Sequence, residues 1–192
     1  GDLLLLLLLA VVARRGTPLR APRPSREVMV QVALLLLLAV ALRLPNLGYS
    51  EFQGDEAAVM LKAAAAVDGR ADALFVHKKG PAEIVVTAVL FGLSGTTSET
   101  AARLPFALAM IAGLLTLYQL GRVLFGPQVA FVAAVLLCLN GFFVAFGRIV
   151  QYQAFVFLFS TLAVLAAWRT RSGLLARRHL AATVVLLAVA LL

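Results

Sequence analysis

Residues 28–44 read VMVQVALLLLLAVALRL, an apolar run that is interrupted only by Gln31 and Arg43. An α-helix rises about 1.5 Å per residue, so this run covers roughly 26 Å of a hydrocarbon core that is about 30 Å thick. Arg43 lies one residue before the end of the run, where a long basic side chain can extend toward the polar interface. The run therefore predicts a helix that crosses a membrane.

The whole chain shares this apolar character. Hydrophobic residues make up 62% of it and charged residues only 14%, against about 25% charged residues in a soluble domain. Further Leu- and Ala-rich runs of helical length lack the apolar–polar alternation of barrel strands. They lie at 104–121, 129–147, 154–168 and 180–192. We therefore predict an all-α polytopic membrane protein.

The distribution of charge predicts how these spans are oriented. Basic residues gather in 14–26, at Arg122 and in 169–178, and the positive-inside rule places such segments in the cytoplasm. Seven of the nine acidic residues lie between 51 and 99, so we expect that segment outside. The net charge of +8 does not indicate nucleic-acid binding, because the arginines flank spans instead of forming a stripe interleaved with aromatic residues.

A loop over 45–103, about sixty residues long, then separates the first two complete spans, where helix connections usually have 2 to 8 residues. The loop contains GPAEIVVTAVLFGLSG, residues 80–95. If this segment crossed the membrane, the basic loop 169–178 would lie outside, so we expect it to lie in the interface or to re-enter. A loop of this length predicts a functional element.

Two adjacent acids stand at the start of a predicted helix in this loop. Gly54 precedes DEAAVMLKAAAAV, a strong helix former that ends at Asp68-Gly69, so Asp55 and Glu56 fall in the first turn. Acids at a helix N-terminus stabilise it by about 0.3 to 1 kcal/mol and need no other purpose. Their place beside a membrane surface, in a loop with several other charged residues, favours a functional site.

Four stretches together resemble a known family. They are LRLPNLGYSEFQGDEA, HKKGPAEIVV, FGLSGTTSETAARLPFALAMIAGLLTLYQLGRVLFG and GRIVQYQAFVFLF. The chain is similar over about residues 28–178 to the N-terminal part of the GT-C glycosyltransferases of family 39, which include protein O-mannosyltransferases and lipid A aminoarabinose transferases. Because it begins with Gly1 and stops within an apolar run at Leu192, we expect an N-terminal fragment of such a protein.

The resemblance implies a GT-C-type transmembrane helix bundle whose long first external loop carries juxtamembrane helices. It also implies a multi-pass plasma-membrane enzyme that moves a sugar, with inversion, from a polyprenyl-phosphate donor to an acceptor hydroxyl outside the cytoplasm. Asp55 matches the family's catalytic carboxylate and is expected to act as general base. Glu56 completes the acidic pair, where it could tune Asp55 or help to bind acceptor or metal. The acceptor stays open.

Cations are expected around the leaving phosphate. Arg103 matches a family arginine and is the first candidate, and Arg148, just after the third span, is the second. Either arginine could instead only extend to the interface from a span end. Lys78 and Lys79 could contact the lipid phosphate or anchor the loop to anionic headgroups.

The chain departs from the family pattern in the loop after the third span. Many relatives carry a second acid there, whereas this chain has Gln151 and Gln153, which form hydrogen bonds but cannot act as bases. This departure argues against metal-assisted chemistry. The sequence leaves a divalent cation open as a cofactor but shows no set of ligands for it. His77 and Glu83 are further candidates for lining the site. The alternative interpretations are a transporter or flippase-like protein, which would need ionisable groups within the spans, and an inactive truncated relative.

Overall fold

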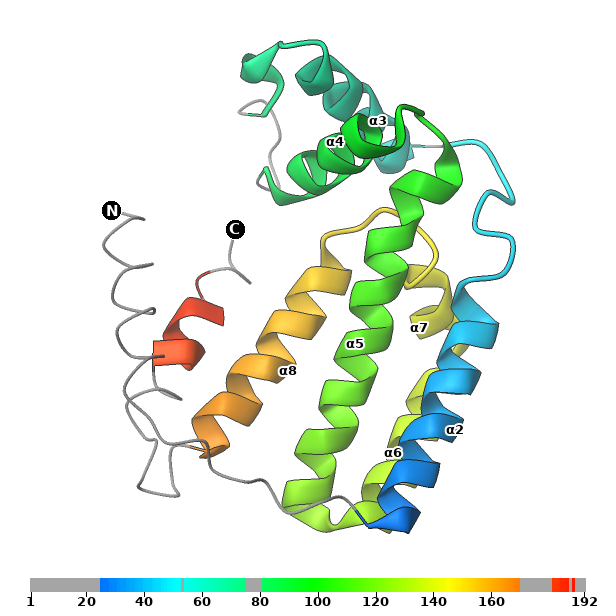
Figure 1. The fold of residues 1–192 in the computed structure, drawn as a ribbon, viewed down its shortest axis with the longest axis vertical. Helices are drawn as coiled ribbons and strands as arrows, with labels where there is room; N and C mark the ends of the chain where they lie inside the picture. The colour runs from blue at the N-terminus through cyan, green and yellow to red at the C-terminus, as the bar shows by residue number, and fades with distance from the viewer. Residues whose placement is uncertain (1–24, 53, 75–80, 170–180, 187, 189–192) are drawn as a thin grey trace.

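The computed structural model describes residues 25–52, 54–74, 81–169, 181–186 and 188 (Figure 1). The regular elements among them are helical: α2 (Arg26–Arg43), α3 (Gly54–Val67), the 3-10 turn η1 (Ala71–Leu74), α4 (Ala82–Ser94), α5 (Glu99–Phe125), α6 (Pro127–Leu139), α7 (Gly141–Phe146) and α8 (Gln153–Arg169). The prediction of an all-α chain is confirmed for this part. Outside the described residues lie His77, Lys78, Lys79, the basic loop after Arg169, and positions 180, 187 and 189–192 of the last predicted span.

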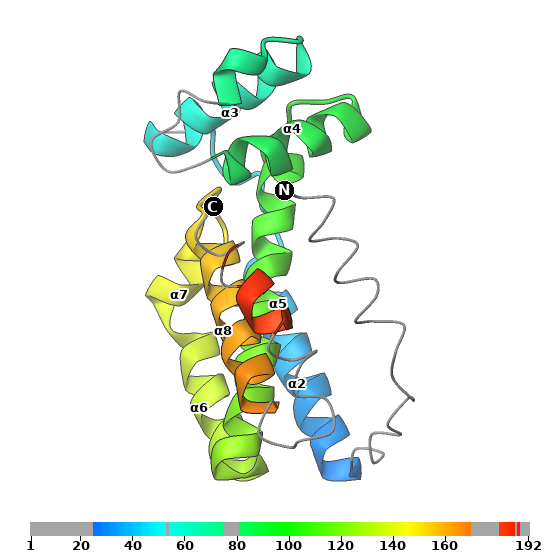
Figure 2. The ribbon, with the colours of Figure 1, turned by 90° about the vertical axis from the view of Figure 1, so that its left-hand side faces the viewer.

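Helices α2, α5, α6 and α8 run side by side as a bundle, with α5 packed against the other three (Figure 1). The chain ascends in α2, descends in α5, ascends in α6 and descends in α8. Helices α3 and α4 pack against each other across one end of this bundle, as both views show (Figures 1 and 2). The segment between α2 and α3 and the segment between α7 and α8 reach the same end, which we call the capped end.

The helix α5 is long and apolar enough to cross a membrane. It contains the predicted span 104–121, and Gly113 lets it approach α8 closely, since a Cβ there would lie 2.5 Å from Cδ1 of Phe157. Helices α4, α6 and α8 are shorter apolar helices. Helix α2 covers nearly all of 28–44 but carries three charged residues, at 26, 27 and 43.

The predicted span 129–147 is divided into two helices. Helix α6 ends at Leu139, and the extended backbone of Asn140 starts α7, where its side-chain oxygen accepts a hydrogen bond of 3.0 Å from the Phe143 N–H. Asparagine is among the best helix N-caps, so it can interrupt an apolar run that a hydropathy average reads as continuous. The break sends the chain toward the capped end.

The helix predicted after Gly54 is confirmed as α3, with both acids in its first turn. One hydrophobic cluster holds the capped end together, and it joins residues of α3, α4, α5 and the segment before α8. Its fully or nearly fully buried members include Val59, Ile84, Phe106 and Val150. The acidic helix α3 is therefore fixed on the bundle by apolar packing.

Candidate active site

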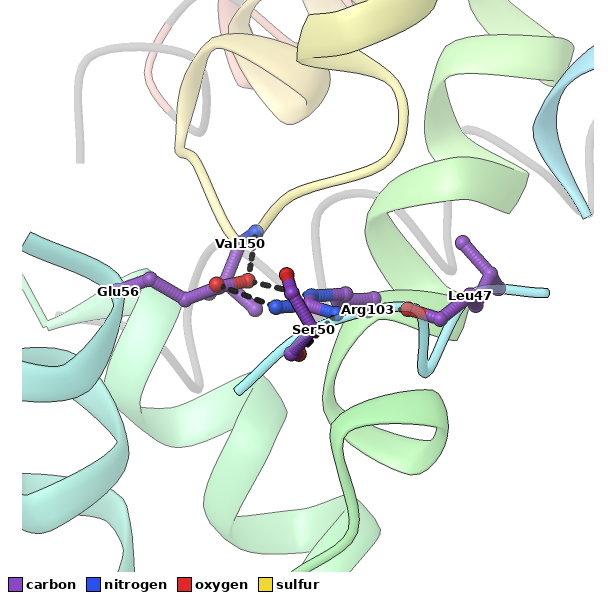
Figure 3. A network of polar contacts seen from close by, with 5 residues as sticks. All are labelled: Leu47, Ser50, Glu56, Arg103 and Val150. Carbon is purple, nitrogen blue, oxygen red and sulfur yellow. Dashed lines mark hydrogen bonds and ion pairs between the residues drawn. The ribbon is translucent and has the colours of Figure 1, made fainter. Parts of the chain in front are cut away.

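Glu56 and Arg103 form a buried ion pair at the capped end (Figure 3). The Nε of Arg103 donates to Oε1 of Glu56 at 2.8 Å, and NH2 donates to Oε2 at 2.7 Å. This parallel, two-bond arrangement is the strongest form of carboxylate recognition by arginine. Since Arg103 is 1% exposed and Glu56 7% exposed, each charge needs the other to be tolerated at this depth.

Arg103 also anchors the segment that leads from α2 into α3. Its NH1 donates to the backbone oxygens of Leu47 at 2.7 Å and Ser50 at 3.0 Å (Figure 3). The rings of Tyr49 and Phe52 lie 5.0 and 5.4 Å from its guanidinium carbon, within cation–π range. Arg103 thus holds α3, α5 and the segment 47–52 in one arrangement.

Arg148 performs a similar task at the C-terminal end of α2. Its guanidinium donates to four backbone oxygens, those of Leu42, Arg43, Pro45 and Asn46, at 2.9 to 3.4 Å. Leu42 and Arg43 belong to the last turn of α2, whose carbonyls have no intrahelical partners, and Pro45 and Asn46 follow the helix. The contacts described for both predicted phosphate ligands, Arg103 and Arg148, are thus made with protein groups. Donor binding by either arginine stays a prediction.

Two carboxylates hold the backbone that leads into α8. Oε1 of Glu56 accepts from the Val150 N–H at 3.0 Å, and Oε1 of Glu83 accepts from the Tyr152 N–H. Glu83 lies in the first turn of α4 and is 2% exposed. The two acids therefore act from two different helices, α3 and α4, on alternate residues of one segment, with Gln151 between them.

A pocket of about 440 Å³ lies beside this network. The described residues that line it include three acids and no basic residue: Tyr49, Ser50, Glu51, Asp55, Glu56, Ile149 and Gln151. Asp55 is exposed, whereas its neighbour Glu56 turns inward to Arg103. The structure thus separates the acidic pair into a buried structural member and a member at the pocket surface.

The remaining predicted site residues fall in different places. Gln151 lines the pocket, whereas Gln153 is the first residue of α8, and its buried side-chain oxygen accepts no hydrogen bond from the described residues. Within the described ranges, no three His, Cys, Asp or Glu side chains lie close enough together to hold a metal ion.

Arg43 was expected to extend toward the interface, and this expectation is wrong. Its side chain is fully buried, with NH2 3.4 Å from the backbone oxygen of Cys138, NH1 3.5 Å from the sulfur of Cys138, and the ring of Phe143 5.1 Å from its guanidinium carbon. The packing of α6 and α7 against the end of α2 encloses it. The signal available in the sequence was a charge inside an apolar window, which often marks an inward-facing residue.

Comparison with protein families places this geometry in context. Residues 78–192, more than half of the chain, match the family described as dolichyl-phosphate-mannose-protein mannosyltransferase. The chain belongs to this family of membrane glycosyltransferases, and the resemblance seen in the sequence is confirmed. The comparisons with curated proteins and with solved structures gave no match. Asp55 and Glu56 precede the matched range, so their assignment depends on the site itself.

Proposed function

We propose that this protein transfers a mannose-type sugar from a polyprenyl-phosphate donor to an acceptor hydroxyl, with Asp55 as the general base. Family membership supports the class of reaction and the lipid-linked donor. The observation that carries the assignment of the base is the different environment of the two adjacent acids. Glu56 is committed to Arg103 and to the Val150 N–H, while Asp55 is exposed at a pocket next to an apolar bundle.

The proposed step is a single displacement. The acceptor oxygen attacks the anomeric carbon from the face opposite the phosphate, the bond between that carbon and the phosphate oxygen breaks, and the electron pair leaves with the polyprenyl phosphate. Asp55 accepts the proton of the acceptor hydroxyl. The anomeric configuration is inverted because one displacement occurs. Glu56 is not required as a second base and acts by positioning.

The donor class can be tested directly with the full-length protein in detergent or proteoliposomes. We expect transfer of radiolabelled mannose from polyprenyl-phosphate-mannose and no transfer from a nucleotide-linked mannose, because the active site is built at the end of a membrane bundle where a lipid tail can be accommodated. Product analysis by NMR should show inversion at the anomeric carbon. Equal use of the nucleotide donor, or retention of configuration, would contradict the proposal.

We further propose that α2, α5, the α6–α7 pair and α8 all cross the cell membrane, with the capped end outside the cytoplasm. The distribution of charge supports this orientation. Glu51, Asp55, Glu56 and Glu83 belong to the capped end, whereas Arg26 and Arg122 belong to the opposite helix ends.

Cysteine labelling tests this orientation. Asp68→Cys places a thiol at the exposed end of α3, and Gln128→Cys places one at the exposed start of α6, at the opposite end of the bundle. We expect a membrane-impermeant maleimide to label the first variant in intact cells and the second only after permeabilisation. Cys138 is fully buried and serves as an internal background control. The reverse labelling pattern would invert the proposed topology.

A further inference from the structure

The segment 150–152 is held at its first and last residues, and its middle residue, Gln151, lines the pocket. The backbone N–H groups of Val150 and Tyr152 are bound by Glu56 and Glu83, and the Val150 side chain is buried in the core at 1% exposure. Ile149 and Gln151, the residues on either side of Val150, line the pocket together with Asp55.

The amide of Gln151 makes no hydrogen bond to any of the described residues, although it is partly enclosed. A primary amide offers two N–H donors and one carbonyl acceptor without a charge. Two neighbouring sugar hydroxyls present the complementary set, since each hydroxyl can both donate and accept. The charged groups next to Gln151 are acids, which also accept hydrogen bonds from hydroxyls and disfavour a phosphate.

From these contacts we infer that Gln151 is a specificity-determining residue that binds adjacent hydroxyls of an uncharged hexose in the pocket beside Asp55. This inference deepens the proposed function and rests on it for the identity of the reaction. The shared chemistry is a hexose with vicinal hydroxyls, carried either by the lipid-linked donor or by a glycosylated acceptor.

Glu56 and Glu83, which bind the backbone on either side of Gln151, explain why a glutamine can be effective at this position. Oε1 of Glu56 and Oε1 of Glu83 accept hydrogen bonds from the backbone N–H groups on either side of Gln151, and these bonds fix the segment. A side chain on a segment fixed at both neighbours loses less conformational freedom when it binds a ligand. Gln151 thus presents its amide from a backbone that is already fixed.

Equilibrium binding in an Asp55→Asn background tests the inference without requiring turnover. In the first arm, the ratio of dissociation constants for polyprenyl phosphate and polyprenyl-phosphate-mannose measures what the sugar contributes. In the second arm, methyl mannoside is titrated onto protein that already holds polyprenyl phosphate. We expect Gln151→Ala to reduce binding in one arm by about five- to tenfold, the size of one or two lost hydrogen bonds.

A change in the first arm assigns the hexose to the donor, and a change confined to the second arm assigns it to the acceptor. Gln151→Met keeps the approximate size of the side chain but removes the amide donors and the acceptor, so it should show the same loss and should exclude a packing effect. Gln128→Ala, at the other end of the bundle, is the matched control. Unchanged binding in both arms for both variants would overturn the inference.

The binding experiment decides the role of Gln151 whether or not the proposed reaction is correct. If the unsubstituted protein transfers no sugar, the proposed reaction is wrong, while the binding ratios still decide the role of Gln151. Conversely, transfer that is normal in the unsubstituted protein and binding that is unaffected by either substitution at Gln151 would remove only the present inference.

Discussion

We expect Asp55→Asn to lower the rate of sugar transfer by about 10² to 10⁴-fold, the contribution that a positioned general base typically makes. Asparagine has nearly the same shape as aspartate, but its neutral amide cannot accept the proton of the acceptor hydroxyl. Asp55 is exposed in the first turn of α3, so the protein is expected to fold and to accumulate in membranes as before. Transfer of mannose from polyprenyl-phosphate-mannose, measured in proteoliposomes at matched protein levels, checks this result.

A matched control separates catalysis from helix stability. Asp68→Asn makes the same chemical change at the exposed C-terminal end of the same helix, and we expect its transfer rate to stay near that of the unsubstituted protein. If Asp55 only stabilised the helix dipole, Asp55→Asn would change stability by about 0.3 to 1 kcal/mol and leave the rate intact. Retained transfer in Asp55→Asn would therefore remove the general base from the proposed mechanism.

The local parts of this site could be predicted from the sequence. Gly54, the alanine-rich run and Asp68-Gly69 are nearest-neighbour signals, so the start, the end and the acidic first turn of α3 follow from them. The apolar runs likewise gave the positions of α2, α5 and α8. The helix bounds alone do not establish how many of these helices cross the membrane, so the crossings stay a proposal.

The partner of each charge could not be predicted, because it depends on how distant segments pack. Glu56 meets Arg103 across 47 residues of sequence and the Val150 N–H across 94. The family resemblance predicted Arg103 at the leaving phosphate, and Glu56 either as a residue that tunes Asp55 or as one that helps to bind acceptor or metal. Burial changes this interpretation, because two opposite charges taken out of water must first satisfy each other.

The helix break at Asn140 was not predicted either, but for a different reason. Its local signal was present as Asn140-Gly141, but a hydropathy average over a span does not record a single capping residue. The consequence for the site is large, because the short helix α7 and the turn after it bring Arg148 and Gln151 to the capped end. Arg148 then binds the end of α2, and Gln151 reaches the pocket.

The buried ion pair makes the second strong prediction. Glu56→Gln leaves Arg103 with an uncompensated charge in a nearly fully buried position, so we expect a loss of about 3 to 5 kcal/mol in the free energy of unfolding. Glu51→Gln changes an exposed acid of the same loop, and its effect should stay within about 0.5 kcal/mol. Chemical denaturation of the full chain in detergent micelles measures both values.

A double-mutant cycle identifies the cause of this loss. Arg103→Met removes the charge as well as the bonds to Leu47 and Ser50, and the combination of Glu56→Gln with Arg103→Met should cost less than the sum of the single changes by about 1 to 3 kcal/mol. Transfer should nevertheless stay low in all three variants, because α3 and the segment 47–52 lose the contacts that set Asp55 in the pocket. If Glu56→Gln abolished transfer while the free energy of unfolding stayed unchanged, Glu56 would act on the substrate itself, and the division of labour between the two acids would have to be reversed.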